Sequence, residues 1–157
     1  MERTTLDEII SLIKREVVPA IGCTEPVAVA LCVAKAAELL GKEPEHIEVR
    51  LSSNILKNAM GVGIPGTGMI GLPIAIALGA IVGKSEYGLE VLRDVCPDAV
   101  ARGRDYIAEG RIDISLDKDA PCNLHIDVAA SAGDESARAI ISREHTNFCL
   151  LYTSPSP

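Results

Sequence analysis

Aromatic residues are scarce in this sequence: its 157 residues include three tyrosines, one phenylalanine and no tryptophan. Hydrophobic residues still make up 48% of the chain against 24% charged residues, which separates it from disordered sequences. The core must therefore be built from aliphatic side chains and alanine. The length is enough for one domain, so we expect a single domain with an aliphatic core.

The sequence also lacks a basic cluster and a long apolar run. Its formal net charge of -7 argues against nucleic acid or an anionic membrane as partner, since both require dense lysine and arginine. The longest apolar run, residues 69–83, is shorter than the ~20 residues that span a bilayer, and Pro73 interrupts it. The first residues lack the apolar segment of a signal peptide. We therefore expect a cytoplasmic protein with a small-molecule or protein partner, and a homo-oligomer remains open.

The five cysteines follow no disulfide or metal-binding spacing. They are spread irregularly, with no C-x-x-C pair and no histidine-rich segment beside them. This spacing excludes a disulfide framework and a self-contained zinc site. Cys32 falls among alanines and valines in a predicted helix, which indicates a core residue. Cys96 and Cys122 lie beside prolines at predicted element boundaries.

Periodicity and capping residues predict a mixture of helices and strands. Helices are expected over residues 5–18, 25–40 (Thr24 as N-cap, Gly41 as stop), 72–82, 87–95 and 98–109. Strands are expected over 46–52, 112–116, 123–129 and 137–143, with a hairpin turn at 133–136. Helices and strands that segregate in this way indicate an α+β fold with a small, partly antiparallel sheet.

A segment rich in glycine and proline follows the first strand, and we predict that it is irregular and leads into a buried helix. Its stretch Gly61–Gly66 matches the dinucleotide fingerprint G-x-G-x-x-G. Eight residues separate it from the preceding strand and Pro65 lies inside it, so a nucleotide-binding module is only an alternative. Backbone N–H groups of Gly66 and Gly68, beside the Thr67 hydroxyl and before a helix, would suit a carboxylate.

Cys23 lies directly before the predicted N-cap of a buried helix. The positive end of a helix lowers the pKa of a thiol, but free cysteine is also among the most buried residue types. Cys23 is therefore either an activated thiol or an apolar filler. Ser53, Asn54 and Asn58 follow a strand and could bind the carboxylate and ammonium of an amino acid, although such residues are also ordinary turn formers.

Four stretches stand out together: GCTEPVAVAL at residues 22–31, residues 52–80, Pro121–Asn123 and His145–Asn147. In combination they resemble the L-cysteine desulfidase family, which is related to the catalytic alpha chain of iron-sulfur L-serine dehydratases. The resemblance covers residues 1–148 and implies the N-terminal part of a longer catalytic unit, a truncated domain. The implied reaction is a β-elimination that converts L-cysteine, or L-serine, to pyruvate and ammonia with release of sulfide or water.

The resemblance also implies a [4Fe-4S] cluster in place of pyridoxal phosphate (PLP). Three cysteines hold the cluster in family members, and its open iron acts as a Lewis acid on the leaving group. The family's proton acceptor is the cysteine of GCTEP, which maps onto Cys23. The family's cluster ligands lie in a C-terminal half, so Cys32, Cys96 and Cys122 receive no metal role and the 157-residue chain alone is expected to be inactive. A non-catalytic regulatory domain on the same scaffold is a second alternative.

The end of the chain changes character. After Phe148 it reads CLLYTSPSP, which has no periodicity and resembles translated sequencing-adapter sequence. We expect residues 149–157 to be a non-native tail and exclude them from functional reasoning. A truncated domain is also expected to expose apolar surface that the absent half would cover.

Overall fold

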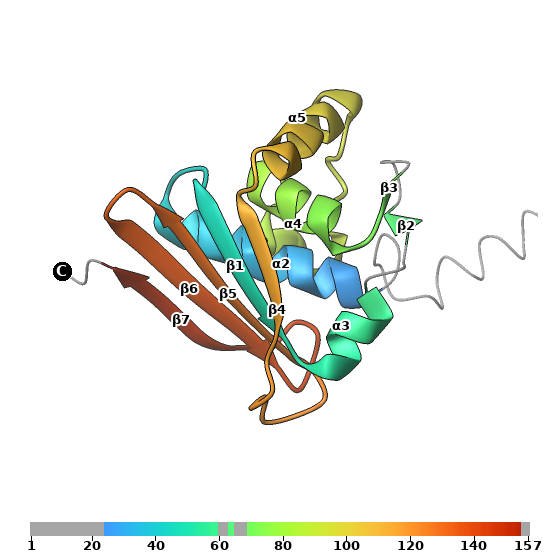
Figure 1. Cartoon of the computed structure of the whole chain (residues 1–157), viewed down its shortest axis with the longest axis vertical. Helices are drawn as coiled ribbons and strands as arrows, with labels where there is room; N and C mark the ends of the chain where they lie inside the picture. Colours follow the sequence, from blue (N-terminus) through green and yellow to red (C-terminus); the bar gives the residue numbers. More distant parts are fainter. Residues whose placement is uncertain (1–23, 60–62, 65–68, 155–157) are drawn as a thin grey trace, which may run out of the picture.

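The computed structural model describes residues 24–59, 63–64 and 69–154, so the predicted first helix lies outside the described residues. Its helices are α2 (Thr24–Leu40), α3 (Ser53–Ala59), α4 (Leu72–Ile81), the 3₁₀ helix η1 (Ser85–Glu90) and α5 (Pro97–Ala108). Its strands are β1 (His46–Leu51), β2 (Gly63–Ile64), β3 (Met69–Ile70), β4 (Ile112–Leu116), β5 (His125–Ala132), β6 (Glu135–Ser142) and β7 (Phe148–Ser154). The α+β prediction is confirmed (Figure 1).

The main sheet has five strands in the order β4-β1-β5-β6-β7. β4 runs parallel to β1 because the helical region between them carries the chain back to the same end, whereas the other neighbours are antiparallel. β5 and β6 form the predicted hairpin, and Ala132 pairs with Glu135 across the turn. Gly133 has a φ of 61° in that turn, a conformation that glycine adopts without strain.

α2 is buried on all sides over residues 26–34 because this part lies between two layers. One side packs on β5 and β6, and α4 covers the other side, with α5 packed on α4 in turn (Figure 1). A Cβ at Gly79 of α4 would lie 2.6 Å from the Ala30 carbonyl oxygen of α2, so only glycine allows this close approach. The predicted end of α2 is also confirmed, since Gly41 follows Leu40 with a φ of 79°.

The opposite face of the sheet carries polar side chains. Glu48, Arg50 and Arg138 are exposed there, and Asp127 is buried beneath the Arg138 guanidinium. Arg138 Nε donates to Asp127 Oδ1 at 2.9 Å, and a second guanidinium N–H donates to Oδ2. The buried carboxylate is thus paired and hydrogen-bonded, as a charge in this position requires.

Two helical regions differ from the prediction. Residues 53–59 form α3 instead of an irregular turn, because Ile55 and Ala59, four residues apart, are buried on the same helix side. The expected helix over 87–95 is wrong: the chain forms the 3₁₀ helix η1 followed by turns. Gly88, with φ 57° and ψ -127°, interrupts the helical backbone.

The C-terminal segment contains a strand. β7 pairs antiparallel with β6, and the register shifts between Ile140 and Ile141. Leu150, Leu151 and Tyr152 of this edge strand are exposed by 42%, 48% and 49%. The segment is therefore ordered against the sheet up to Ser154, while its non-native origin stays a prediction. None of the helices described here is long and apolar enough to span a bilayer.

Candidate functional site

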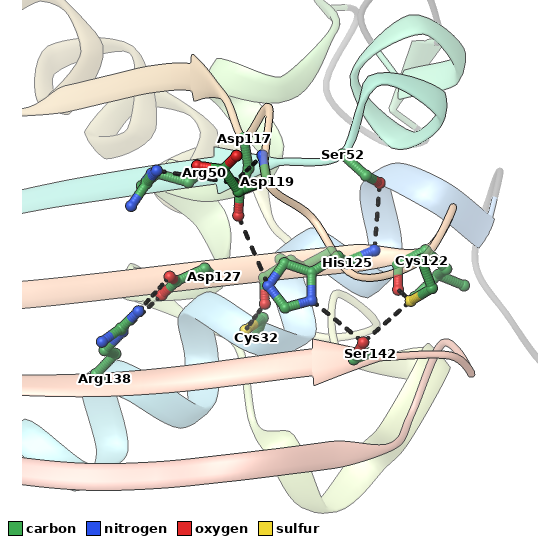
Figure 2. A network of polar contacts seen from close by, with 12 residues as sticks. Cys32, Arg50, Ser52, Asp117, Asp119, Cys122, His125, Asp127, Arg138 and Ser142 are labelled. Carbon is green, nitrogen blue, oxygen red and sulfur yellow. Dashed lines mark hydrogen bonds and ion pairs between the residues drawn. The ribbon is translucent and has the colours of Figure 1, made fainter.

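Three segments that are distant in sequence meet at one end of the main sheet. β1 ends at Leu51, β5 begins at His125 and β6 ends at Ser142. The register places Leu51 opposite Ile126, and His125 opposite Ser142. Because β5 is antiparallel to both neighbours, its start lies beside their ends (Figure 2). Ser52, the first residue of the stretch 52–80 that was singled out in the sequence, lies at this end, as do the motifs Pro121–Asn123 and His145–Asn147.

Ser52 connects the end of β1 to the segment that leads into β5. It is 3% exposed, and its hydroxyl donates to the Asn123 carbonyl oxygen at 2.7 Å. Ser52 Oγ accepts the His125 backbone N–H at 3.2 Å, and the Ser52 N–H donates to the His125 carbonyl at 3.0 Å. These bonds fix the approach to β5 against the end of β1, directly before α3.

A chain of four polar side chains crosses the end of the sheet (Figure 2). Cys122 Sγ lies 3.1 Å from Ser142 Oγ, which lies 3.2 Å from His125 Nδ1. On the other side of the imidazole, His125 Nε2 lies 3.7 Å from Asp117 Oδ2. His125 and Ser142 are 8% and 6% exposed, so bulk water does not separate these groups.

Asp117 is held in place at the end of β4. Its backbone N–H donates to the Leu51 carbonyl at 2.8 Å, and its Oδ1 accepts the Asp119 N–H at 3.1 Å. Arg50 Nη2 lies 3.7 Å from the same Oδ1. The carboxylate is therefore fixed, and one of its oxygens faces the His125 ring.

The hydrogen bond from Ser142 to the sulfur is the largest cause that lowers the pKa of Cys122 below its ordinary value. Main-chain hydrogen bonding from Arg143 and the charge of its guanidinium act in the same direction, while burial opposes them. The Leu124 carbonyl oxygen lies 2.9 Å from the sulfur and can accept the thiol proton. Relative to an ordinary cysteine, Ser142 and Arg143 favour the thiolate, which is the nucleophilic form.

The Cys122 thiol borders an open cavity of about 380 Å³. His125, Ser142, Arg143 and Asn147 also line it. Asn147 Nδ2 donates to the Ser142 carbonyl at 2.9 Å, and the Ser142 N–H donates to the Asn147 carbonyl at 3.1 Å. Arg143 lies inside this loop with a φ of 75°, the single positive φ of a non-glycine residue in the described part of the chain. The loop therefore holds a strained backbone at the rim of the cavity.

The predicted substrate-binding residues are placed only in part. Ser53, Asn54 and Asn58 are exposed on α3, which contacts α2 (Figure 1), and they do not line the cavity. Cys23, Gly66, Thr67 and Gly68 lie outside the described residues. α2 includes Thr24, so the predicted N-cap belongs to the helix that follows Cys23 in sequence. The assignment of Cys23 and of the substrate cradle stays a prediction.

Sequence reasoning missed the Asp117, Cys122, His125 and Ser142 group. Cys122 received no role, and Ser142 was only part of a predicted strand. The available signal was the Pro121–Asn123 motif at the start of the strand predicted over 123–129, which contains His125. The group is completed by the pairing of β5 with β6, which no local pattern specifies.

The described neighbours of the glycine-rich fingerprint differ from those of a dinucleotide-binding motif. Such a motif joins a strand to a helix. Here the helix α3 precedes it, and Gly63 lies in β2, which pairs antiparallel with β3. The described geometry therefore gives the nucleotide alternative no support.

The described residues do not fit an iron-sulfur cluster. In this part of the chain no three potential metal-binding side chains gather. Cys32 is fully buried between α2 and the sheet, and its thiol lies 3.2 Å from the Ala139 carbonyl oxygen. Burial strongly raises its pKa, which disfavours the thiolate that binds iron. That the cluster ligands lie elsewhere in the parent protein stays a prediction.

Comparison with known proteins gives relatives without a stated activity. A UPF0597 protein of Bacteroides thetaiotaomicron is 64% identical over 146 residues, which are 93% of this chain and 34% of that protein. UPF0597 proteins of Porphyromonas gingivalis and Aeromonas hydrophila are 53% identical over 154 residues and 45% identical over 144 residues, covering 98% and 92% of this chain but 35% and 32% of those proteins. The chain spans about a third of the length of the curated relatives that it matches. No protein-family model and no solved structure matches it.

Proposed function

We propose that this chain is the N-terminal part of a lyase that eliminates sulfide from L-cysteine, or water from L-serine, to give pyruvate and ammonia. The observation that supports the proposal is the convergence of the motifs that carry the family resemblance. Ser52, Cys122 and Asn147 belong to three of these motifs and adjoin the same end of the sheet. Convergence of distant motifs is expected of a functional site, because catalytic groups must reach the same substrate.

In this proposal Cys23 accepts the α-proton of the amino acid. It directly precedes α2, a helix of 17 residues, whose positive end favours a thiolate. When the Cα–H bond breaks, its electron pair forms the Cα–Cβ double bond and the bond from Cβ to sulfur or oxygen breaks. The resulting aminoacrylate tautomerises to an imine, which water hydrolyses. Polar groups of residues 53–58 and 66–68 bind the carboxylate and ammonium of the substrate.

The proposed cofactor is a [4Fe-4S] cluster, without PLP. Its cysteines come from the two thirds of the relatives' length that this chain does not cover, since the described cysteines do not assemble a site. The 157-residue chain alone is then inactive. Anaerobic reconstitution of this chain with iron and sulfide, followed by a sulfide-release assay, tests that part: turnover by the chain alone contradicts it.

The role of Cys23 is tested in the full-length protein after anaerobic reconstitution. We expect Cys23→Ser to lower pyruvate formation from L-cysteine by about a hundredfold or more, which is typical of losing an acid–base group. Cys96→Ser is the matched control because Cys96 is exposed at the start of α5, and it should keep full activity. Full activity in the Cys23 variant would overturn the assignment.

The two alternatives have direct tests. Calorimetric titration of the chain with a dinucleotide should give no binding heat, whereas saturable binding favours a nucleotide module. The reading frame beyond Phe148 decides the regulatory alternative, since a downstream region without three cysteines that meet in space removes the cluster.

A further inference from the structure

The group at the end of the sheet has a chemistry of its own. It combines a thiol, a hydroxyl, an imidazole and a carboxylate in contact order, and its thiol opens on a cavity. The proposed elimination takes its thiol from Cys23 and assigns no chemical step to Cys122, His125 or Asp117. An inference about the Cys122 thiol therefore does not require the role proposed for Cys23.

The distances define one route for the thiol proton. Cys122 can donate to Ser142 Oγ at 3.1 Å while the Ser142 hydroxyl donates to His125 Nδ1 at 3.2 Å. A proton that moves along this route leaves a thiolate at Cys122 and an imidazolium at His125. The imidazolium then faces Asp117 Oδ2 at 3.7 Å, which stabilises its charge.

Further charged and titratable side chains lie near Cys122, Ser142, His125 and Asp117. Arg143 lines the cavity and favours the thiolate, and Cys149 lines the same cavity. Arg50 lies on the far side of Asp117 and does not line the cavity. The only cation that the described cavity presents beside the thiol, apart from the histidine, is therefore the guanidinium of Arg143.

We propose that Cys122 is the nucleophile of a thiol–disulfide exchange site that takes small disulfides bearing a carboxylate. The Cys122 thiolate attacks one sulfur of the disulfide, a new S–S bond forms and the old S–S bond breaks. The departing thiolate takes the proton held by His125, relayed through Ser142, and leaves as a thiol. No electrons are gained or lost overall, and Arg143 provides the counter-ion for the carboxylate.

The 157-residue chain itself is the test material, and the readout is the rate of mixed-disulfide formation at each cysteine at pH 7. Trypsin places Cys96, Cys122 and Cys149 on different peptides, so mass spectrometry resolves the three. With 3,3′-dithiodipropionate we expect Cys122 to react severalfold faster than the exposed Cys96, because Ser142 and Arg143 stabilise the Cys122 thiolate. Equal rates at the two cysteines contradict the proposal.

Two variants test the proton relay, defined as the contacts from Cys122 through Ser142 to His125. Ser142→Ala should slow the reaction of Cys122 severalfold and leave Cys96 unchanged, since the hydroxyl that contacts the sulfur is removed. Ser136→Ala, in the same strand but at its other end, is the matched control and should change neither rate. If Ser142→Ala does not fold, the pH profile of the unmodified chain decides: the midpoint for Cys122 must lie below the ordinary thiol pKa of 9.0, and a midpoint at or above that value overturns the relay.

Two small disulfides of opposite charge test the ligand class. Cystamine carries two ammonium groups where 3,3′-dithiodipropionate carries two carboxylates. We expect Cys122 to prefer the carboxylate reagent by severalfold relative to Cys96, and Arg143→Gln to abolish that preference. If the ratio of the reaction rates with the two reagents is the same at Cys122 and at Cys96, the carboxylate specificity is overturned.

Discussion

Cys32 and Cys122 are both free cysteines, but their environments change the pKa of the thiol in opposite directions. Cys32 is fully buried between α2 and the sheet, and burial, then the charge of Asp127, raises the pKa of its thiol. Cys122 lies at the end of the sheet beside Ser142, whose hydrogen bond lowers the pKa of its thiol. The layer between α2 and the sheet is therefore specialised for packing, and the end of the sheet has the groups needed for chemistry.

The largest effect on stability is expected where α4 approaches α2 at Gly79. A Cβ in Gly79→Ala would meet the Ala30 backbone oxygen at 2.6 Å, so one helix must shift. We expect a loss of about 2–3 kcal/mol in the free energy of unfolding, the range of overpacked cores. Urea unfolding followed by circular dichroism measures it.

Gly103→Ala is the matched control for that substitution. Its Cβ would lie 2.9 Å from the flexible end of Ile74, which can move aside, and its distances of 3.5 Å to Leu78 and 3.7 Å to Ala77 are ordinary contacts. We expect a change of less than about 1 kcal/mol, since better helix propensity offsets the adjustment. Equal losses in the two variants would show that the core does not depend on the close approach of α2 and α4.

A smaller loss is expected from Cys32→Ala. Removing a fully buried sulfur leaves a small void, which should cost about 1–2 kcal/mol in the free energy of unfolding. Cys122→Ala should cost less, because its thiol borders an open cavity. The same urea titration compares the two, and a greater loss at Cys122 contradicts the assignment of packing to one thiol and chemistry to the other.

The pH dependence of stability should also depend on Cys32. Its folded pKa is raised above the ordinary value of 9.0, so above that pH the unfolded chain loses a proton that the folded chain keeps. Stability should therefore be unaffected by this group below pH 9 and fall as the pH rises above it, by about 1 kcal/mol at pH 10. Cys32→Ala should remove this part of the alkaline loss, and an unchanged loss in the variant argues against it.

The smallest expected effect concerns the far end of the relay. Asp117→Asn keeps the acceptor for the Asp119 N–H but removes the charge that faces His125. We expect Cys122 to react about threefold to fivefold more slowly with a neutral alkylating reagent. This factor corresponds to the interaction free energy of a partly exposed ion pair. An unchanged rate would show that the Asp117 charge does not act on the thiol and that the relay includes only Cys122, Ser142 and His125.

Local patterns were sufficient for much of the fold. α2 and β1 were predicted to within a residue because apolar periodicity and Gly41 mark them. α3 was missed because its helix depends on burial of Ile55 and Ala59 by neighbours, which spacing over seven residues does not reveal. β7 was missed because an edge strand exists through its pairing with β6.

The candidate site was less predictable than the fold. Ser142 meets His125 only because β5 and β6 pair in one register, and a shift by one residue would turn each side chain to the other face. Asp117 arrives from β4, which reaches the site through a parallel crossover. Such a group follows from topology, whereas Cys23 could be singled out from its position before a helix.

The contrast between the two thiols is tested most directly by an NMR titration of the chain labelled with ¹³C at cysteine Cβ. The chemical shift of each Cβ reports the ionisation of its own thiol, and single cysteine-to-serine variants assign the signals. We predict that Cys122 titrates below its ordinary pKa of 9.0 and that Cys32 does not titrate before the chain unfolds. Titration of both cysteines together near pH 9 would contradict the account.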